Sequence, residues 1–273
     1  MFPIVYLNGQ YLPKEQAALN VADLAILRGF GIFDYFRYTD GQPRFIEDHL
    51  DRFSRSAKLL ALEIPASREE LREAVHQLIA RNGGGDGGIR FVLTGGYALD
   101  GYTPTHPNLV AMAYPFKGHS TEDYERGMKV HLHHYERQFP EVKSIDYLEG
   151  IRIQPMLKSL GADYALYVDR NDNVRESDRS NFLIVKDGKL ITPVDNILHG
   201  ITRLHLLKLA GQLGIPIEER PVSVAELKAA DEAIICSSMK GAMAITLVDG
   251  VAVGDGLPGL VTRRLMLGWE KYV

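Results

Sequence analysis

The order of strand-like and helix-like segments constrains the fold of this chain more than any other feature of the sequence. In the first 115 residues, short runs rich in β-branched and aromatic residues alternate with two helical patterns, at 49–63 and 67–82. The second pattern begins with Ser67 and Glu70, which have the spacing of a capping box. This alternation predicts a small α/β domain. The strand-like runs are 4–9, 32–38, 88–96 and 108–115, and Asn8-Gly9 predicts the turn of a hairpin at the start of the chain.

The second part of the chain has a different pattern. Segment 115–123, PFKGHSTED, is rich in Pro, Gly, Ser and charge, which is typical of a connection between domains. Beyond it most segments are strand-like, and the helical patterns are fewer. We therefore predict an α+β protein of two domains, a small one at 1–120 and a larger, mostly β one at 121–273 with helices on its outside. The helical patterns of the larger domain lie at 147–161, 201–214 and 260–273.

Composition excludes several classes of protein. A chain of 273 residues can bury a large core, so its stability requires neither disulfides nor a structural metal. Cys236 is the single cysteine, which rules out an intrachain disulfide and fits a reducing compartment. No apolar run approaches the roughly 20 residues of a membrane span, and the start lacks the pattern of a signal peptide. A net charge of −4 gives no basic footprint for nucleic acid. We expect a cytoplasmic protein whose partners are small molecules.

Two charged residues of the second half lie where an aromatic cofactor would need them. Lys143 is flanked by Val142 and Ile145 between a β-rich stretch and a helical pattern, and a semi-apolar cleft there would favour a neutral, nucleophilic amine. Glu176 follows a turn and precedes a strand-like run. If its carboxylate faces inward, it can hold a proton on a pyridine nitrogen. Taken alone, either residue is more often an ordinary surface charge.

Other segments suit the binding of a phosphate. Gly200 directly precedes a helical pattern with Thr202 in its first turn, and helix N-termini present free backbone N–H groups to anions. Ser237 and Ser238 close a strand-like run and supply hydroxyl groups for the same purpose. An ordinary helix start looks the same, so only the combination of these features indicates an anion site.

Together these segments resemble the large domain of the class IV aminotransferases, the pyridoxal-phosphate enzymes of fold type IV. The resemblance spans nearly the whole chain. It implies a two-domain fold, pyridoxal 5′-phosphate as cofactor, and transfer of an amino group between an amino acid and a 2-oxo acid. The segments that carry it, in matching order and spacing, are EVKSIDYLEGIR (141–152), VRESDRSNFLIV (174–185), LHGITR (198–203) and ICSSMKGAMAI (235–245).

The resemblance also implies roles for individual residues. Lys143 would carry the cofactor as a Schiff base and then serve as the catalytic base, and Glu176 would be the partner of the pyridine nitrogen. Arg52 would bind the phosphate from the first domain. Tyr147 would lie beside the phenolic oxygen, and its neighbour Asp146 stands where many members have asparagine. The other residues of the predicted phosphate site are Ile201, Thr202, Ser237 and Ser238.

The first domain determines which substrate is expected. Segment 26–38, ILRGFGIFDYFRY, lacks the Glu-Gly-(Ile/Val)-Arg run of branched-chain enzymes, and it has Phe33 where the more familiar D-amino-acid transaminases use tyrosine. Arg28 and Arg90 instead resemble a less common group of D-amino-acid transaminases. We expect both to bind substrate carboxylates, because a guanidinium pair can clamp them bidentately. Arg28 would reach in from the neighbouring subunit of a homodimer. Otherwise each arginine is a surface charge.

Several alternatives stay open. The same scaffold and cofactor also serve branched-chain L-amino-acid transaminases and 4-amino-4-deoxychorismate lyases. His131, His133 and His134 lie on a strand-like run without the cysteines or carboxylates of a metal site, so no metal is predicted. Lys240 is close to Ser238 in sequence but is left outside the predicted site, because a solvent-facing position accounts for it equally well.

Overall fold

The computed structural model describes residues 1–272, and the described chain divides into two compact units. Unit 1 consists of Met1–Lys117 together with the short segment Val142–Tyr147. Unit 2 consists of Gly118–Glu141 and of the chain from Leu148 onward. Mixed helix and sheet in this arrangement confirm the predicted α+β fold class. Val273, the last residue of the expected C-terminal helix, lies outside the described residues.

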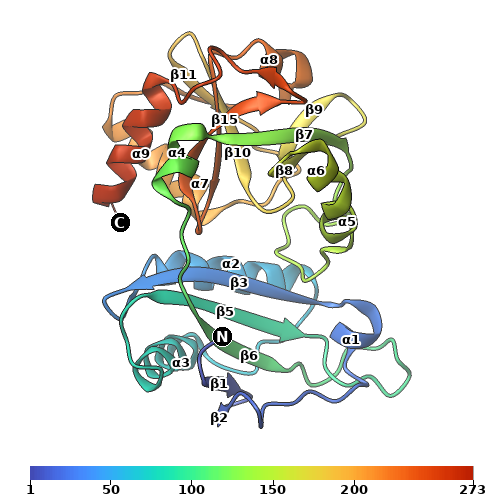
Figure 1. Cartoon of the computed structure of the whole chain (residues 1–273). Coiled ribbons are helices and arrows are strands. Elements are labelled where there is room, and N and C mark those ends of the chain that lie inside the picture. The colour runs from blue at the N-terminus through green and yellow to red at the C-terminus, as the bar shows by residue number, and fades with distance from the viewer. Residues whose placement is uncertain (273) are drawn as a thin grey trace. The chain divides into compact units, whose positions relative to one another are not determined.

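Unit 1 is built on a six-stranded antiparallel sheet with the strand order β2-β1-β6-β5-β3-β4 (Figure 1). Asn8 and Gly9 both have positive φ, of 48° and 88°, and they form the predicted two-residue turn of the first hairpin. The strands are β1 (Ile4–Leu7), β2 (Gln10–Pro13), β3 (Gly31–Thr39), β4 (Gln42–Pro43), β5 (Gly87–Thr94) and β6 (Leu109–Pro115).

Two long helices close the core of unit 1. Helix α2 (Ile46–Leu59) packs on β3, and α3 (Arg68–Arg81) packs on β1 and β6 (Figure 1). The capping box of Ser67 and Glu70 at the start of α3 is present as predicted. The short helix α1 (Leu24–Arg28) ends at Gly29, which adopts the left-handed conformation. Fully buried aromatic and aliphatic side chains fill the space between sheet and helices, among them Phe36, Tyr38, Phe53, Leu78 and Phe91.

Unit 2 is built on a mixed ten-stranded sheet in the order β12-β11-β10-β14-β15-β7-β8-β9-β13, with β16 paired to β15. The parallel pairs are β7 with β8, β7 with β15, and β11 with β12, and the other pairs are antiparallel. The strands are β7 (Met128–His134), β8 (Tyr164–Val168), β9 (Asn173–Ser177), β10 (Asn181–Lys186), β11 (Lys189–Thr192), β12 (Ile217–Glu219), β13 (Val222–Ser223), β14 (Glu232–Ser237), β15 (Gly241–Val248) and β16 (Val251–Ala252).

The helices of unit 2 cover this sheet. Helices α7 (Ile201–Gln212) and α9 (Leu260–Tyr272) pack on each other and on β14 (Figure 1). Trp269 of α9 lies so close to Gly241 that a Cβ atom there would come within 2.5 Å of the indole ring. The remaining helices are short: α4 (Thr121–Arg126), α5 (Leu148–Arg152), α6 (Gln154–Leu160) and α8 (Val224–Lys228).

The structure differs from the sequence-based division at residues 142–147. This segment packs within unit 1, and not with the rest of the predicted domain 121–273, because its backbone pairs with the start of β3. The N–H of Phe33 donates to the carbonyl of Lys143 at 2.9 Å, and the N–H of Ile145 donates to the carbonyl of Gly31 at 3.0 Å. The expected helix at 147–161 is also split into α5 and α6. Pro155, in the first turn of α6, has no N–H group to continue a helix from α5.

Candidate active site

Lys143 is held through its backbone by two elements of unit 1. Its carbonyl accepts from the N–H of Phe33 on β3, and its own N–H donates to the Ser56 hydroxyl on α2 at 3.2 Å. Gly31 allows this close approach, because a Cβ atom there would lie 2.7 Å from the carbonyl oxygen of Leu93 and 3.1 Å from the Ile145 side chain. The partly buried Lys143 therefore lies on a fixed backbone, with its side chain directed by β3 and α2.

The ring of Phe33 brings three predicted site residues of unit 1 together. The Lys143 ammonium nitrogen lies 4.5 Å from the centre of this ring, and the guanidinium carbon of Arg90 lies 5.2 Å from it. The Tyr147 ring makes an edge contact with Phe33 at a centroid distance of 5.7 Å. Lys143, Tyr147 and Arg90 thus share one neighbourhood, although 53 residues separate Arg90 from Lys143 in the chain.

Arg90 has an unusual environment for an arginine. Its guanidinium also lies near the rings of Tyr35 and Tyr114, at 6.0 and 5.9 Å, and it makes no ion pair with any carboxylate among residues 1–272. The side chain is exposed within the described chain. A guanidinium that is placed among aromatic rings and lacks an acidic partner is suited to bind a carboxylate from outside the chain.

The other predicted arginines of unit 1 differ from each other. Arg28 is exposed at the end of α1, where it donates only to the carbonyl of Leu27 among the described residues. Arg52 on α2 is 5% exposed and forms two hydrogen bonds with Asp34 of β3, at 2.9 and 2.7 Å. The structure therefore leaves Arg28 open to solvent within the described chain and fixes Arg52 in a buried ion pair.

In unit 2, the Glu176 carboxylate is held by three donors. Arg137 donates to Oε1 at 2.9 Å, the N–H of Leu198 donates to Oε2 at 3.0 Å, and the Asn181 amide donates to Oε2 at 3.4 Å. Glu176 is 5% exposed. Hydrogen bonds to the charged form, above all from arginine, favour an ionised carboxylate.

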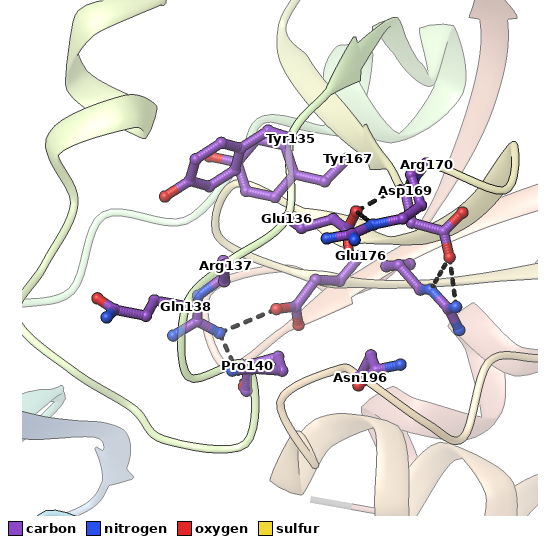
Figure 2. A pocket seen from close by; sticks show the side chains of 11 residues that line it. Tyr135, Glu136, Arg137, Gln138, Pro140, Tyr167, Asp169, Arg170, Glu176 and Asn196 are labelled. Carbon is purple, nitrogen blue, oxygen red and sulfur yellow. Dashed lines mark hydrogen bonds and ion pairs between the residues drawn. The ribbon is translucent and has the colours of Figure 1, made fainter.

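Glu176 and Arg137 also line a cavity of about 380 Å³ (Figure 2). Figure 2 shows the Arg137 guanidinium directed at the Glu176 carboxylate and at the carbonyl of Pro140. Arg137 is not among the site residues predicted from the sequence. Its position three residues before Pro140 gave no signal, because the ion pair joins residues 39 apart in the chain.

The predicted start of helix α7 is connected to Glu176. Gly200 is the residue before this helix, no side chain caps it, and Ile201 and Thr202 follow as buried residues of the first turn. A Cβ atom on Gly200 would come within 2.0 Å of the Asn181 side chain, which donates to the carbonyl of Leu198. Asn181 therefore joins the loop before α7 to the Glu176 carboxylate.

The turn between β14 and β15 carries Ser237 and Ser238. The hydroxyl of Ser237 is buried and has no hydrogen-bond partner among residues 1–272. A buried hydroxyl without a partner costs free energy, so the Ser237 hydroxyl is suited to donate to an anion or another acceptor.

Lys240 belongs to the same turn, and it does not face solvent. Its side chain is buried, its amine donates to the Ser180 hydroxyl at 3.0 Å, and the amine lies 4.1 Å from the centre of the Tyr164 ring. Burial, together with the nearby Arg179 guanidinium, lowers the pKa of Lys240 to about 8. Sequence reasoning missed this residue because nothing local distinguishes a buried lysine at a turn from an exposed one.

Two of the three histidines of β7 have acidic partners. His131 lies 2.7 Å from Asp249, and His133 lies 2.6 Å from Glu149. The described part of the chain contains no group of three His, Cys, Asp or Glu side chains arranged to hold a metal ion. No helix within residues 1–272 is both long enough and apolar enough to span a bilayer.

Comparison with known proteins yields several matches that cover nearly the whole chain. Residues 31–248 match the family model of amino-transferase class IV. A D-alanine aminotransferase of Staphylococcus epidermidis is 34% identical over 98% of this chain and 97% of its own length. A putative branched-chain-amino-acid aminotransferase of Methanocaldococcus jannaschii is 32% identical over 98% and 94%. The branched-chain amino acid aminotransferase of Escherichia coli has a TM-score of 0.92 at 27% identity, covering 97% of this chain and 93% of that one.

Proposed function

The chain belongs to the class IV aminotransferases, and on that premise we propose that it moves the amino group of a D-amino acid, such as D-glutamate or D-alanine, to a 2-oxo acid such as α-ketoglutarate. The resemblance identified in the sequence is confirmed for the family and for an aminotransferase reaction. Members of this class depend on pyridoxal phosphate and use amino acids and 2-oxo acids as substrates. The roles of individual residues, the choice of a D-amino acid, a homodimer and a cytoplasmic location belong to the proposal.

The residues of each unit fit chemical groups of pyridoxal 5′-phosphate. In unit 2, the unpartnered Ser237 hydroxyl and the uncapped start of α7 at Ile201 and Thr202 suit the phosphate, with Ser238 beside them. The Glu176 carboxylate, which accepts hydrogen bonds from Arg137, Leu198 and Asn181, suits a protonated pyridine nitrogen. In unit 1, Lys143 supplies the amine, Tyr147 a phenol for the cofactor's phenolic oxygen, and Arg52 a guanidinium for the phosphate.

The protein's own groups then have defined tasks. Pyridoxal phosphate, when bound, supplies an aromatic ring that withdraws electrons from the α-carbon of the amino acid. Glu176 would hold a proton at the pyridine nitrogen, and the guanidinium of Arg137 would keep the Glu176 carboxylate charged for that purpose. The Lys143 amine would accept the proton from the α-carbon.

Arg90 is the observation that carries the substrate assignment. The Arg90 guanidinium forms no ion pair with the described carboxylates and contacts the same Phe33 ring as the Lys143 amine. A carboxylate bound by Arg90 would therefore be near the reacting carbon. The partner subunit's Arg28 would supply a second guanidinium for a substrate with two carboxylates. A D-alanine aminotransferase among the relatives supports the choice of D-amino acids.

A second candidate is a branched-chain L-amino-acid transaminase. It is favoured by the relative from Methanocaldococcus jannaschii, which is named a putative enzyme of that kind. The exposed guanidinium of Arg90 can bind a side-chain carboxylate such as that of glutamate, whereas the apolar side chain of leucine offers it no acceptor. The D-amino acid is therefore the first choice.

The cofactor assignment is tested by borohydride reduction of the purified protein followed by peptide mapping. We expect a stable phosphopyridoxyl label on the peptide that contains Lys143, and a Lys143→Ala variant should take up none. A label on another lysine, or no label, contradicts the proposed site.

The substrate assignment is tested by supplying D-glutamate, D-alanine or L-leucine as donor and measuring the 2-oxo acid formed. Arg90→Ala should raise the KM for D-glutamate by about tenfold or more, because one charged hydrogen-bonding partner is lost. The exposed Arg55 of the same unit offers a control, and Arg55→Ala should leave this KM unchanged. Activity with L-leucine alone would establish the second candidate instead.

A further inference from the structure

Asp34 and Arg52 form a buried ion pair in which one edge of the guanidinium, Nε and Nη2, donates to the carboxylate. Nε of Arg52 donates to Oδ2 of Asp34 at 2.9 Å, and Nη2 donates to Oδ1 at 2.7 Å. Among residues 1–272, nothing accepts a hydrogen bond from Nη1. The arginine is thus clamped on one edge while its other end keeps donors for a further acceptor.

His49 fixes the carboxylate in turn. Its Nδ1 lies 2.8 Å from Oδ1 of Asp34, and the N–H of Tyr35 donates to the same oxygen at 2.7 Å. An ionised carboxylate only accepts hydrogen bonds, so Nδ1 of His49 carries the proton in this contact. Asp34 is fully buried and His49 is 3% exposed, so neither side chain has room to turn away.

The charges of this cluster cancel. Burial alone would raise the pKa of Asp34, but Arg52 and His49 outweigh it and hold that pKa well below its usual range. Burial lowers the pKa of His49, which favours the neutral imidazole despite the neighbouring carboxylate. One guanidinium is therefore balanced by one carboxylate. Asp34 reduces the attraction that Arg52 exerts on an anion, and any benefit for anion binding must come from orientation.

We propose that Asp34 is a positioning residue that, supported by His49, aims the free end of Arg52 at the cofactor phosphate. The inference rests on the proposed function, since Arg52 is expected to bind that phosphate. Holding the guanidinium in place before the anion arrives removes the entropy cost of ordering a long side chain at the moment of binding. If Asp34, His49 and Arg52 only filled the core, changing them would not affect the binding of phosphate in particular.

The change in anion affinity that follows removal of the Asp34 charge shows whether Asp34 orients Arg52 or only neutralises it. Asp34→Asn removes the negative charge beside Arg52. If the carboxylate only neutralised the arginine, an anion would bind more tightly to this variant. If the carboxylate orients the arginine, pyridoxal phosphate should bind about tenfold more weakly, and pyridoxal, which lacks the phosphate, should bind as it does to the wild type.

The experiment uses the full-length enzyme, from which the cofactor is removed by dialysis with an amino donor. Pyridoxal phosphate and pyridoxal are then titrated by absorbance, and inorganic phosphate is titrated by its effect on the Tm. Asp34→Asn should lose affinity for both phosphate compounds only. Equal or tighter binding of pyridoxal phosphate, or an equal loss for pyridoxal, overturns the inference.

A milder pair of variants covers the case in which Asp34→Asn does not fold. His49→Leu removes the N–H that holds Asp34 without changing the charge, whereas the amide of His49→Asn can replace that N–H. We expect the loss of phosphate affinity in His49→Leu alone, and equal affinities in both variants contradict the inference.

The phosphate titration also separates this inference from the proposed function. If borohydride leaves Lys143 unlabelled while phosphate still stabilises the wild type and not Asp34→Asn, the proposed function fails and the positioning role stands. If phosphate fails to stabilise the wild type, the positioning role fails as well.

Discussion

Arg52 of unit 1 and Lys240 of unit 2 are two buried cations, and they are held in opposite ways. In unit 1 the Arg52 guanidinium forms two hydrogen bonds with the fully buried Asp34, and both groups are charged. In unit 2 the Lys240 amine is just as buried, with 5% exposure for each residue, but its partners are a hydroxyl and an aromatic ring. Burial lowers the pKa of Lys240 to about 8, so this amine is close to losing its proton at neutral pH.

The difference shows that two cations of equal burial can have different chemistry. A paired guanidinium is a permanent charge in a fixed place, because no accessible pH removes its proton. A buried lysine that is not paired with a carboxylate titrates near neutral pH, because burial lowers its pKa. While it is charged, it lowers the stability of the folded state. The charge of Arg52 suits the binding of an anion. The buried amine of Lys240 lowers the stability of the folded chain, and replacing it with an apolar residue can remove this cost.

The strongest test of the comparison is to leave Arg52 buried without its partner. In the chain without cofactor, Asp34→Leu should lower the free energy of unfolding by about 3–5 kcal/mol, because the buried charge of Arg52 loses its carboxylate partner. The double variant Asp34→Leu with Arg52→Met should recover most of that loss, since no charge is left in the core. Urea denaturation measures both, and a double variant as unstable as the single one would show that the loss comes from packing.

The opposite result is expected for Lys240. Lys240→Met should raise the free energy of unfolding at pH 7 by about 1–3 kcal/mol, because a charged form that burial disfavours is replaced by an apolar side chain of similar length. Lys189→Met, at an exposed position on β11, serves as control and should change stability little. A loss of stability in Lys240→Met would mean that the contacts with Ser180 and Tyr164 outweigh the burial cost.

The pH dependence of stability sharpens the same comparison. The pKa of Lys240 is about 8 in the folded protein and 10.5 for a lysine that is not buried. Between pH 8 and pH 10.5 the unfolded chain therefore binds one proton more than the folded chain. Stability that depends on Lys240 therefore rises as the pH increases from 8 to 10.5 and is level below 8. The difference between wild type and Lys240→Met should shrink across this interval. A difference that is independent of pH would contradict the lowered pKa.

The smallest expected effect concerns the unpartnered hydroxyl beside Lys240. Ser237→Ala should stabilise the chain without cofactor by about 1 kcal/mol, because it removes a buried polar group that has no hydrogen bond there. The same substitution should weaken the binding of pyridoxal phosphate if Ser237 contacts the phosphate. Thermal unfolding with and without cofactor measures both effects, and destabilisation in both states would argue for an unseen structural role.

Local signals in the sequence predicted the elements that depend on neighbouring residues. The capping box of Ser67 and Glu70 and the Asn8-Gly9 turn are complete within four residues, and the structure contains both. The start of α2 was placed at His49, three residues late. Phe45, which precedes the helix, has a left-handed backbone and no side-chain cap, so the usual start signal is missing.

Contacts between residues far apart in the chain could not be predicted from the sequence. Arg137 pairs with Glu176 across 39 residues, and Lys240 reaches Ser180 across 60. Neither residue stands in a local pattern that distinguishes it from a surface charge. The resemblance to a family supplied the residues that members share, whereas the supporting contacts of Arg137 and Asp34 required the packed structure.

The close contact of Trp269 with Gly241 has a practical consequence. The chain has one tryptophan, and it lies against the first residue after the turn that carries Ser237 and Lys240. Its fluorescence is therefore a built-in optical reporter of that turn. A shift in emission when phosphate is added would follow the event at this position in real time, without a dye or any change to the chain.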